Sequence, residues 1–470
     1  MDSLGLPEMP GFPPHVFRSD DIRGRVGQEI DARFAHALGL AVGRCAAELD
    51  RRAVVVGKDA RLSSVELGAA LQAGVRESGM AVIDIGMAAT PLTWFAARLT
   101  DTAAAVSVTG GQDDDAYNGF KIVLDGEVLG QAALQALRGR MHAQPVQSAR
   151  SARSGGRAKI NTAQCYIARV ASDVRLERSM KVALDCTRGS AGSLVSDLLL
   201  ELGCEVAEIA GDMTGAYPDD IRHRGDDRYL ADLAAALRYG DCELGLSIAG
   251  DGDRLTVISK SGACISSDRL LILFARDILN GTHGGAVVHD VKSSRNVARE
   301  IRALGGMAVV SRGGDMHIGA RMRETGALLA GETGGGIRFK DRWYGYSDGT
   351  YAAARLLELL SRDDDASAVL DALPQSCATP ELRLDTADGE QYRLIEALRA
   401  NGRFMGAREI LHLDGVRVEY EDGFGLARPA SAQPAVMLRF EGDNGIALSR
   451  IQEDFRRQLL SVAPGLRLPF

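Results

Sequence analysis

Short β-rich runs alternate with amphipathic helical patterns along most of this chain, and this alternation constrains its fold more than any other feature. Strands are expected at 53–57, 81–85, 103–108, 181–185, 205–209, 244–248, 286–290 and 307–310, and helices at 64–78, 189–203, 294–304 and 317–324. Alternation of this kind is typical of α/β units with parallel strands. We therefore expect several rounds of one α/β architecture.

The C-terminal part has a different pattern. Strands are expected at 416–420 and 435–440, with a loop at 428–434 between them and a long helix at 444–460. At 470 residues the chain is too long for one ordinary core, and it suggests three or four domains. The predicted fold class is α/β, with related α/β domains followed by a C-terminal α+β domain.

Composition excludes some classes of function. The formal net charge of −8 argues against a general binder of nucleic acid or of anionic membranes, although it permits a local basic pocket. The seven cysteines are scattered without a CxxC pair, which favours reduced thiols over a disulfide framework or a zinc site. The N-terminus lacks the pattern of a signal peptide and no apolar run reaches membrane-spanning length, so a cytoplasmic protein is expected.

Three of the apolar runs open into Gly-rich polar loops, at 105–110, 244–250 and 327–331. In open α/β sheets, ligands bind beyond the carboxyl ends of the strands. Three such loops from related units could face one ligand site.

The second of these loops has the chemistry of a cation site. Asp251 and Asp253 alternate with glycine in a Gly-Asp-Gly-Asp-Arg turn, an arrangement that can aim several oxygens at a hard ion such as Mg²⁺. Ala249 stands where a third carboxylate would extend the alternation. Two carboxylates hold Mg²⁺ weakly, and the alternative interpretation is a polar turn whose carboxylates cap the following segment.

Three further segments carry a family resemblance: Phe-Arg-Ser-Asp-Asp-Ile-Arg-Gly at 17–24, Tyr-Asn-Gly-Phe-Lys-Ile at 117–122 and Arg-Trp-Tyr-Gly-Tyr-Ser-Asp-Gly at 342–349. With the Gly-rich loops they make the chain resemble the α-D-phosphohexomutases, specifically the bacterial phosphomannomutase/phosphoglucomutase branch, from about Phe17 to about Leu460. The resemblance implies three related α/β domains with mixed sheets plus a C-terminal α+β domain around a central cleft. The expected boundaries are 1–157, 158–263, 264–375 and 376–470.

The resemblance also implies a reaction, the reversible interconversion of hexose 1-phosphate and hexose 6-phosphate. In the family a phosphoserine donates its phosphoryl group to the sugar, and Mg²⁺ held by three aspartates and the phosphoserine neutralises the transferring group. Such a transfer depends mostly on positioning and electrostatic stabilisation.

Four loops of this chain depart from the family pattern. The serine loop, Thr-(Gly/Ala)-Ser-His-Asn-Pro in the family, reads Thr-Gly-Gly-Gln-Asp-Asp here, so Gly111 stands at the phosphoserine position and has no oxygen to carry a phosphoryl group. The metal loop has Ala249 in place of an aspartate. The sugar loop reads Gly-Glu-Thr-Gly-Gly-Gly instead of Gly-Glu-Met-Ser-Gly-His, and a nearby family histidine aligns with Asp315. The phosphate loop reads Arg-Pro-Ala-Ser-Ala-Gln-Pro instead of Arg-Ala-Ser-Asn-Thr-Thr-Pro, which removes two hydroxyl groups and one backbone N–H.

Several positions still match functional positions of the family, so the resemblance implies roles for them. The catalytic positions are Gly111 (inactive), Arg23 and Lys121; the substrate-binding positions are Lys292, Glu332, Arg428 and Ser431; the metal positions are Asp251 and Asp253, beside Arg254. Mg²⁺ binding is expected to be weak or lost.

Three hypotheses follow. The first is a phosphohexomutase-fold pseudoenzyme, a regulator or sugar-phosphate binder that takes a hexose phosphate, a nucleotide sugar or a protein partner such as an active mutase. The second is a divergent sugar-phosphate enzyme with an Asp of the 113–115 loop as nucleophile, against the plainer interpretation of a solvated acidic loop. The third is a structural interaction protein, in which Asp113 to Asp115 fold inward and neutralise cations such as Lys121 or Arg254. No nucleic acid or membrane partner is expected.

Overall fold

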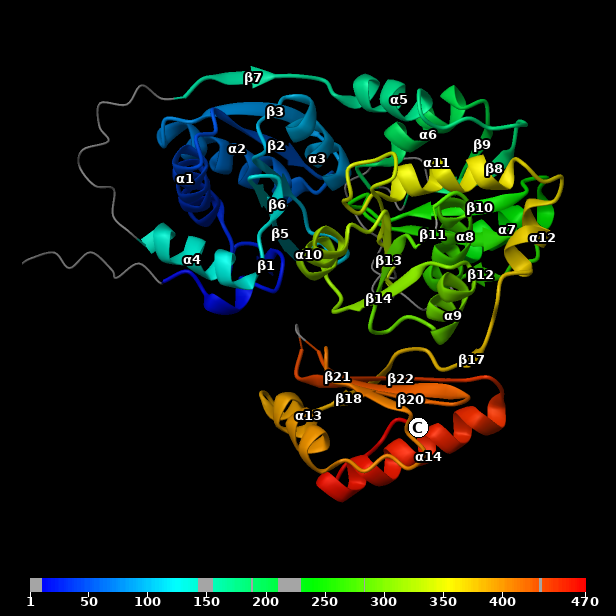
Figure 1. Cartoon of the computed structure of the whole chain (residues 1–470). Helices are drawn as coiled ribbons and strands as arrows, with labels where there is room; N and C mark the ends of the chain where they lie inside the picture. Colours follow the sequence, from blue (N-terminus) through cyan, green and yellow to red (C-terminus); the bar gives the residue numbers. More distant parts are fainter. Residues whose placement is uncertain (1–10, 143–154, 187–188, 210–229, 283, 431–432) are drawn as a thin grey trace, which may run out of the picture. The chain divides into compact units, whose positions relative to one another are not determined.

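The structure, a computed structural model, describes residues 11–142, 155–186, 189–209, 230–282, 284–430 and 433–470. It divides into two compact units: the first holds most of the chain up to Tyr166 and the second holds most of the remainder. Their elements are labelled in Figure 1, and each unit is described by itself.

The first unit is built on a mixed seven-stranded sheet in the order β1-β5-β4-β2-β3-β7, with β6 paired to β5. Strands β2, β3, β4 and β7 run parallel, whereas β5 is antiparallel to both β1 and β4. The strands are β1 (Ile22–Arg25), β2 (Ala53–Lys58), β3 (Ala81–Met87), β4 (Ala105–Val108), β5 (Tyr117–Leu124), β6 (Glu127–Val128) and β7 (Arg157–Lys159). The helices are η1 (Pro14–Val16), α1 (Ala32–Glu48), α2 (Leu62–Glu77), α3 (Thr90–Leu99) and α4 (Gln131–His142).

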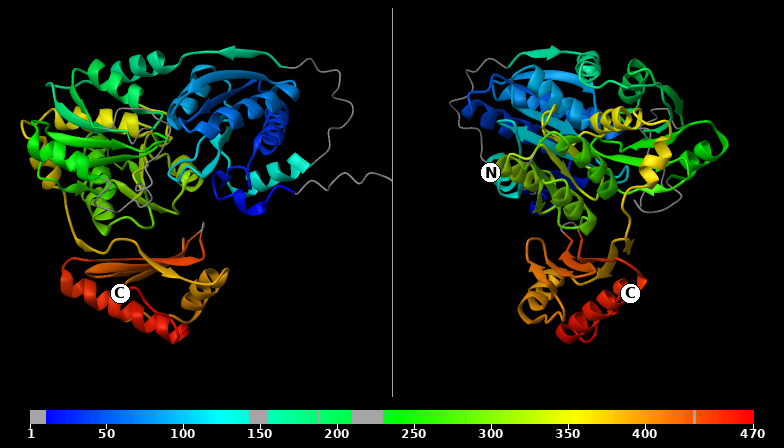
Figure 2. Two further views of the ribbon diagram at one scale, coloured as in Figure 1. Left: turned by 180° about the vertical axis from the view of Figure 1, so that it is seen from behind. Right: turned by 45° about the vertical axis from the view of Figure 1, so that its right-hand side comes forward.

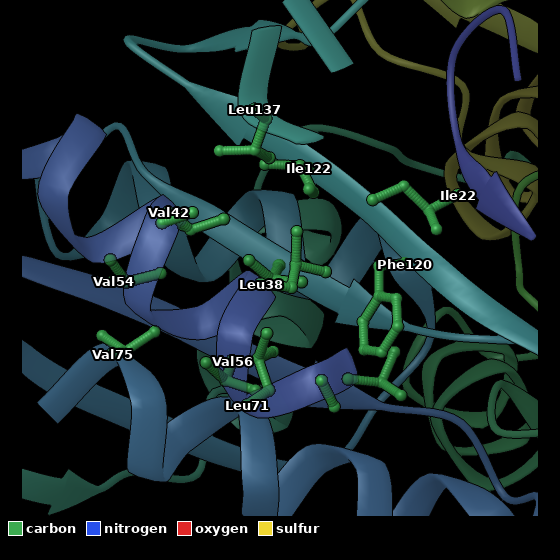
Figure 3. Packing of buried hydrophobic residues seen from close by; sticks show 14 of the residues in the cluster. Ile22, Leu38, Val42, Val54, Val56, Leu71, Val75, Phe120, Ile122 and Leu137 are labelled. Carbon is green, nitrogen blue, oxygen red and sulfur yellow. The ribbon is translucent and has the colours of Figure 1, made fainter. Parts of the chain in front are cut away.

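Helices cover both faces of this sheet. At Gly57 in β2 there is no room for a side chain because Thr93 of α3 lies against it, while the next residue, Lys58, contacts α2 at Gly68. Successive residues of a strand point to opposite faces, so α2 and α3 lie on opposite faces. Figure 3 shows the core on the α2 side, where Leu38 of α1, Leu71 of α2, and strand residues interdigitate. Burial of each such side chain stabilises the fold by about 1.5–3 kcal/mol.

The second unit contains two further α/β sheets. The first has the order β12-β11-β10-β8-β9 and the second has the order β14-β13-β15-β16. The strands are β8 (Lys181–Asp185), β9 (Glu205–Glu208), β10 (Leu244–Ile248), β11 (Leu255–Ser259), β12 (Cys264–Ile265), β13 (Ala286–Asp290), β14 (Met307–Ser311), β15 (Leu329–Gly331) and β16 (Ile337–Phe339). The helices are α5 (Ala163–Ala171), which spans the boundary between the units, α6 (Gly192–Glu201), α7 (Ala231–Tyr239), α8 (Ser267–Leu279), α9 (Arg295–Ala303), α10 (Asp315–Thr325), α11 (Gly349–Leu360) and α12 (Ala366–Asp371).

The C-terminal part of the second unit is an antiparallel sheet in the order β17-β22-β21-β20-β19, with β18 paired to β22. Its elements are β17 (Cys377–Ala378), β18 (Leu382–Asp385), α13 (Glu390–Asn401), β19 (Glu409–Leu411), β20 (Val416–Tyr420), β21 (Gly423–Pro429), β22 (Ala435–Gly442) and α14 (Gly445–Val462). Figures 1 and 2 show α13 and α14 on one face of this sheet. The predicted fold class, three α/β domains with mixed sheets followed by an α+β domain, is confirmed.

One expectation about local structure was wrong. The loop expected at 428–434 begins later, because Arg428 and Pro429 still pair with Met437 and Val436 at the end of β21. Backbone pairing with a neighbouring strand decides the structure of this segment.

Candidate active site

The predicted serine loop follows β4 and has a glycine, Gly111, where the family resemblance implies the phosphoserine. Gly111 has a φ of +57°, in the left-handed region that favours glycine, and its N–H donates to Thr109 Oγ1 at 2.9 Å. A β-carbon at this position would lie 2.9 Å from Arg23 Nη2, closer than ordinary van der Waals contact. Both the backbone and the surrounding space are therefore suited to glycine.

Arg23, in β1, is buried beside this loop and has acidic neighbours. It donates to Asp21 Oδ2 at 2.6 Å, and its Nε lies 3.7 Å from Asp113 Oδ2. Arg18 Nη1 lies 3.6 Å from the same Asp113 oxygen. Burial opposes ionisation of Asp21, but the charges of Arg23, Arg18 and Lys121 hold its pKa below its usual value. Asp21 and Asp113 thus place carboxylates beside Arg23, to which the family resemblance assigns a catalytic position.

The buried side chain of Arg61 holds the acidic loop in place. Its guanidinium donates to the backbone oxygens of Asp113 at 2.6 Å and Asp114 at 2.7 Å, and it lies 3.3 Å from Asp59 Oδ2. Sequence reasoning missed Arg61. The available signal was the Asp-Ala-Arg segment directly after the strand at 53–58, at the carboxyl end where ligands bind.

The metal loop is the tight turn between β10 and β11. Asp251 and Asp253 are buried, and the Asp253 N–H donates to Asp251 Oδ1 at 3.3 Å. Gly252 between them has a φ of +81°, and its carbonyl accepts a bond from the Gly349 N–H at 2.9 Å. Ala249 is buried at the same turn and supplies no ligand.

The metal turn presents few side-chain oxygen donors for a cation. Within the described ranges, no group of three or more His, Cys, Asp or Glu side chains is arranged to hold a metal. Mg²⁺ prefers an octahedron of oxygens, gives up its water reluctantly, and is usually held by one or two carboxylates together with substrate phosphates. Asp251 and Asp253 provide two carboxylates.

The sugar loop follows β15 and is joined to the metal loop. Arg254 forms a β-bridge with Gly336, and the Leu255 N–H donates to the Gly335 carbonyl at 3.2 Å. Glu332 is held by a bond from the Gly314 N–H at 2.7 Å. Burial raises the pKa of Glu332, and nearby carboxylates add to the effect against the charge of Arg338. The structure therefore brings together the predicted residues of these two loops.

Sequence reasoning did not predict the ion pair that lies beside Glu332. Asp315, aligned with a family histidine, pairs with Arg338 of β16, and Ser347 Oγ donates to the same carboxylate at 3.2 Å. Arg338 is buried. It sits in the middle of a short strand, where a sequence offers no sign that its side chain meets Asp315.

Lys292 and Arg428 converge on a carboxylate that the sequence analysis also missed. Lys292 Nζ lies 3.6 Å from Asp290 Oδ2, and Arg428 donates to Glu381 Oε1 at 2.7 Å. Burial opposes ionisation of Glu381, yet the charges of Lys292 and Arg428 hold its pKa below the usual value. Ser431, the remaining predicted substrate-binding residue, lies outside the described residues.

Three Gly-rich loops that follow β4, β10 and β15, one of them an Asp-Gly-Asp-Arg turn, define an α-D-phosphohexomutase architecture. The chain belongs to the phosphoglucomutase/phosphomannomutase family: models of its α/β/α domains I, II and III match residues 14–146, 164–262 and 266–377. The described helices include none that is long and apolar enough to cross a membrane.

Similar proteins include enzymes and solved structures. A phosphoglucomutase of Neisseria meningitidis is 40% identical over 442 residues, which are 94% of this chain and 96% of that protein. A phosphomannomutase/phosphoglucomutase of Pseudomonas aeruginosa is 38% identical over 468 residues, covering 99% of this chain and 100% of that protein. A crystal structure of a phosphoglucomutase/phosphomannomutase family protein from Burkholderia thailandensis has a TM-score of 0.90 at 41% identity, covering 98% of this chain and 100% of that one.

Proposed function

We propose that this chain is a catalytically inactive phosphomannomutase/phosphoglucomutase homologue that serves hexose-phosphate metabolism as a regulator or sugar-phosphate binder. One observation carries the proposal: Gly111 stands where the family has the serine that accepts and donates the phosphoryl group. A carbon-bound hydrogen cannot carry that group, so covalent turnover through this position is lost.

The surroundings of Gly111 support the proposal independently. Asp113 and Asp21 pair with Arg23, a cation that would otherwise be available to an incoming phosphate. At the metal turn, Ala249 stands where the family has a third aspartate, and Gly111 supplies no phosphoserine oxygen, so we infer that Mg²⁺ binding is weak or lost.

Retained cations support a binding role. Lys292 and Arg428 keep their family positions and lie around one carboxylate, Glu381. A hexose phosphate or a nucleotide sugar would compete with Glu381 for these two charges, so its binding should be modest and should weaken as salt rises. A protein partner, such as an active mutase, could place an acidic segment there.

A coupled assay tests the loss of activity. The purified full chain is supplied with glucose 1-phosphate or mannose 1-phosphate, Mg²⁺ and the corresponding bisphosphate, and the Pseudomonas aeruginosa relative is assayed beside it. Loss of a covalent nucleophile typically lowers kcat by roughly 10⁶-fold, so we expect no turnover above background. Turnover within about a hundredfold of an ordinary kcat of ~10 s⁻¹ would overturn the proposal.

A second candidate function is a divergent phosphotransferase with Asp113 as nucleophile. The observation in its favour is the position of the Asp113 carboxylate, 3.6 Å from Arg18 and 3.7 Å from Arg23, since paired guanidiniums could stabilise a transferring phosphoryl group. If turnover is found, Asp113→Asn should abolish it, whereas Asp115→Asn, at the other end of the loop, should retain it.

A further inference from the structure

We propose that the first unit carries a second anion site, suited to a small phosphomonoester, in a cavity between helix α2 and the strands β2, β3 and β7. The cavity has a volume of about 240 Å³. Its lining residues come from these elements, and none belongs to the serine loop at 109–116. The site is therefore additional to the family's active-site loops.

The charge of the cavity is positive. Lys58, Arg76 and Arg157 line it together with one acid, Asp84. Burial opposes ionisation of Asp84, but bonds from Arg157 at 2.6 Å and from the Gly86 N–H at 2.9 Å, together with the charge of Lys58, hold its pKa below the usual value. Three cations against one carboxylate leave a net charge of +2, which matches a phosphomonoester dianion.

Two of these cations are available to a ligand. Across the ranges that the structure describes, the side chain of Lys58 makes no ion pair within 4 Å and donates no hydrogen bond, although the residue is half-buried. Arg76 uses only its Nε, which donates to the Gly155 carbonyl at 2.8 Å. Its two terminal nitrogens keep donors that can bind phosphate oxygens in a bidentate manner.

Gln72 supplies a second, independent sign of a ligand. Its side chain lines the cavity from α2, the residue is only 6% exposed, and its amide has no hydrogen-bond partner among the described residues. Because Gln72 lines the cavity, its amide is within reach of a ligand there. A ligand that carries both hydroxyl groups and phosphate oxygens would satisfy its donor and its acceptor.

The shape of the cavity limits the size of the ligand. About 240 Å³ is below the range of roughly 300–1,000 Å³ typical of sites for drug-sized ligands, so it suits a phosphate on a small carbon skeleton. Val65, Ala69 and Ala73 recur every four residues along α2 and form an apolar wall, against which such a skeleton can pack. A hexose monophosphate meets these requirements, and a nucleoside monophosphate tests the upper limit of size.

Acetylation of lysines on the intact, full-length protein, followed by mass spectrometry, tests this site directly. The probes are glucose 1-phosphate, AMP, inorganic phosphate and sulfate. At a ligand concentration about ten times Kd, about nine-tenths of the sites are filled, so the labelling rate of Lys58 should fall about tenfold. Lys159, exposed in the nearby strand β7 but absent from the cavity lining, serves as the internal reference and should change little.

Matched variants identify the residues responsible. Gln72→Leu and Arg76→Met should each abolish most of the protection of Lys58. Arg98→Met removes the same charge from α3, on the opposite face of the sheet, and should leave the protection unchanged. If Arg76→Met does not fold, the labelling of the unmodified protein and the labelling of the Gln72→Leu variant still test the site.

Three results would overturn the site. The first is labelling of Lys58 that none of the probes changes. The second is equal protection by sulfate and by the phosphomonoesters, which indicates an adventitious ion only. The third is protection of Lys292 without protection of Lys58, which would assign binding to the family's loops and leave the proposed sugar-phosphate binding intact.

Discussion

At position 111, two separate features favour glycine. The φ of +57° costs a residue with a side chain about 1–3 kcal/mol, and a β-carbon would approach Arg23 Nη2 to 2.9 Å. A serine at this position would therefore meet both an unfavourable backbone conformation and the Arg23 guanidinium.

Gly111→Ser should consequently lower the free energy of unfolding by about 1–3 kcal/mol. Gly139→Ala is the matched control: it lies inside α4 with no atom within 4 Å of a new β-carbon, and it should be neutral or stabilising by about 0.5–1 kcal/mol. Urea unfolding followed by circular dichroism measures both. Equal stability of Gly111→Ser and the parent protein would show that the loop relaxes freely.

A second residue makes stability depend on pH. His289 is buried in β13, where burial and the charge of Arg417 lower its pKa from 6.5 to about 4. Between these two pKa values the unfolded chain binds a proton that the folded chain does not. The contribution of His289 is therefore complete above pH 6.5 and is lost as pH falls towards 4, by up to about 3 kcal/mol.

Thermal unfolding between pH 7.5 and 4.5 checks this expectation. The non-titrating variant His289→Gln should show a shallower loss of stability than the parent protein below pH 6.5, because the other acidic and histidine groups contribute equally to both curves. Parallel curves would contradict the burial of a neutral imidazole.

At the scale of elements, the sequence predicted regular strands and helices well where apolar periodicity was strong. The strands at 181–185, 286–290 and 416–420 have the bounds that their apolar runs predicted, because each run is buried. β21 was missed because Gly423, Gly425 and Pro429 disfavour a strand locally. Pairing with both β20 and β22 overrides that preference.

Helix α11 offers a test of element packing through one buried charge. Arg355 is 1% exposed, lies 2.9 Å from Asp341 and 3.4 Å from Asp277, and stacks over Phe339. Arg355→Met removes one partner of a buried network and should destabilise the second unit by about 3–5 kcal/mol. Arg362→Met removes a contact to the same Asp277 from a half-exposed side chain and should cost less than about 1 kcal/mol. Similar denaturation midpoints for the two variants would exclude the buried network as a major source of stability.

At the scale of the whole molecule, the sequence identified the family and predicted which positions are replaced, but it did not predict the contacts around them. Gly111 and Ala249 could be found by comparing loops with the family pattern. Arg338 and Glu381 could not, because their partners are distant in the sequence. For Arg61 the sequence offers only its place directly after the strand at 53–58, because the partners of its side chain include backbone carbonyls. Contacts of this kind depend on the packing of the loops and leave no motif.

The replacements lie on loops of different domains, so repair should be strongly non-additive. Gly111→Ser alone leaves Asp113 beside Arg23, two carboxylates at the metal turn, and the altered phosphate loop, and should stay at background in the coupled mutase assay. Combining it with Asp113→Asn, Ala249→Asp and the family's Ser-Asn-Thr run at 430–432 should give measurable turnover, because residues that act as one catalytic unit contribute only together. The combined variant without Gly111→Ser is the control and should be inactive. Robust activity of Gly111→Ser alone would mean that the other replacements do not impair catalysis, and the pseudoenzyme proposal would then rest on a single side chain.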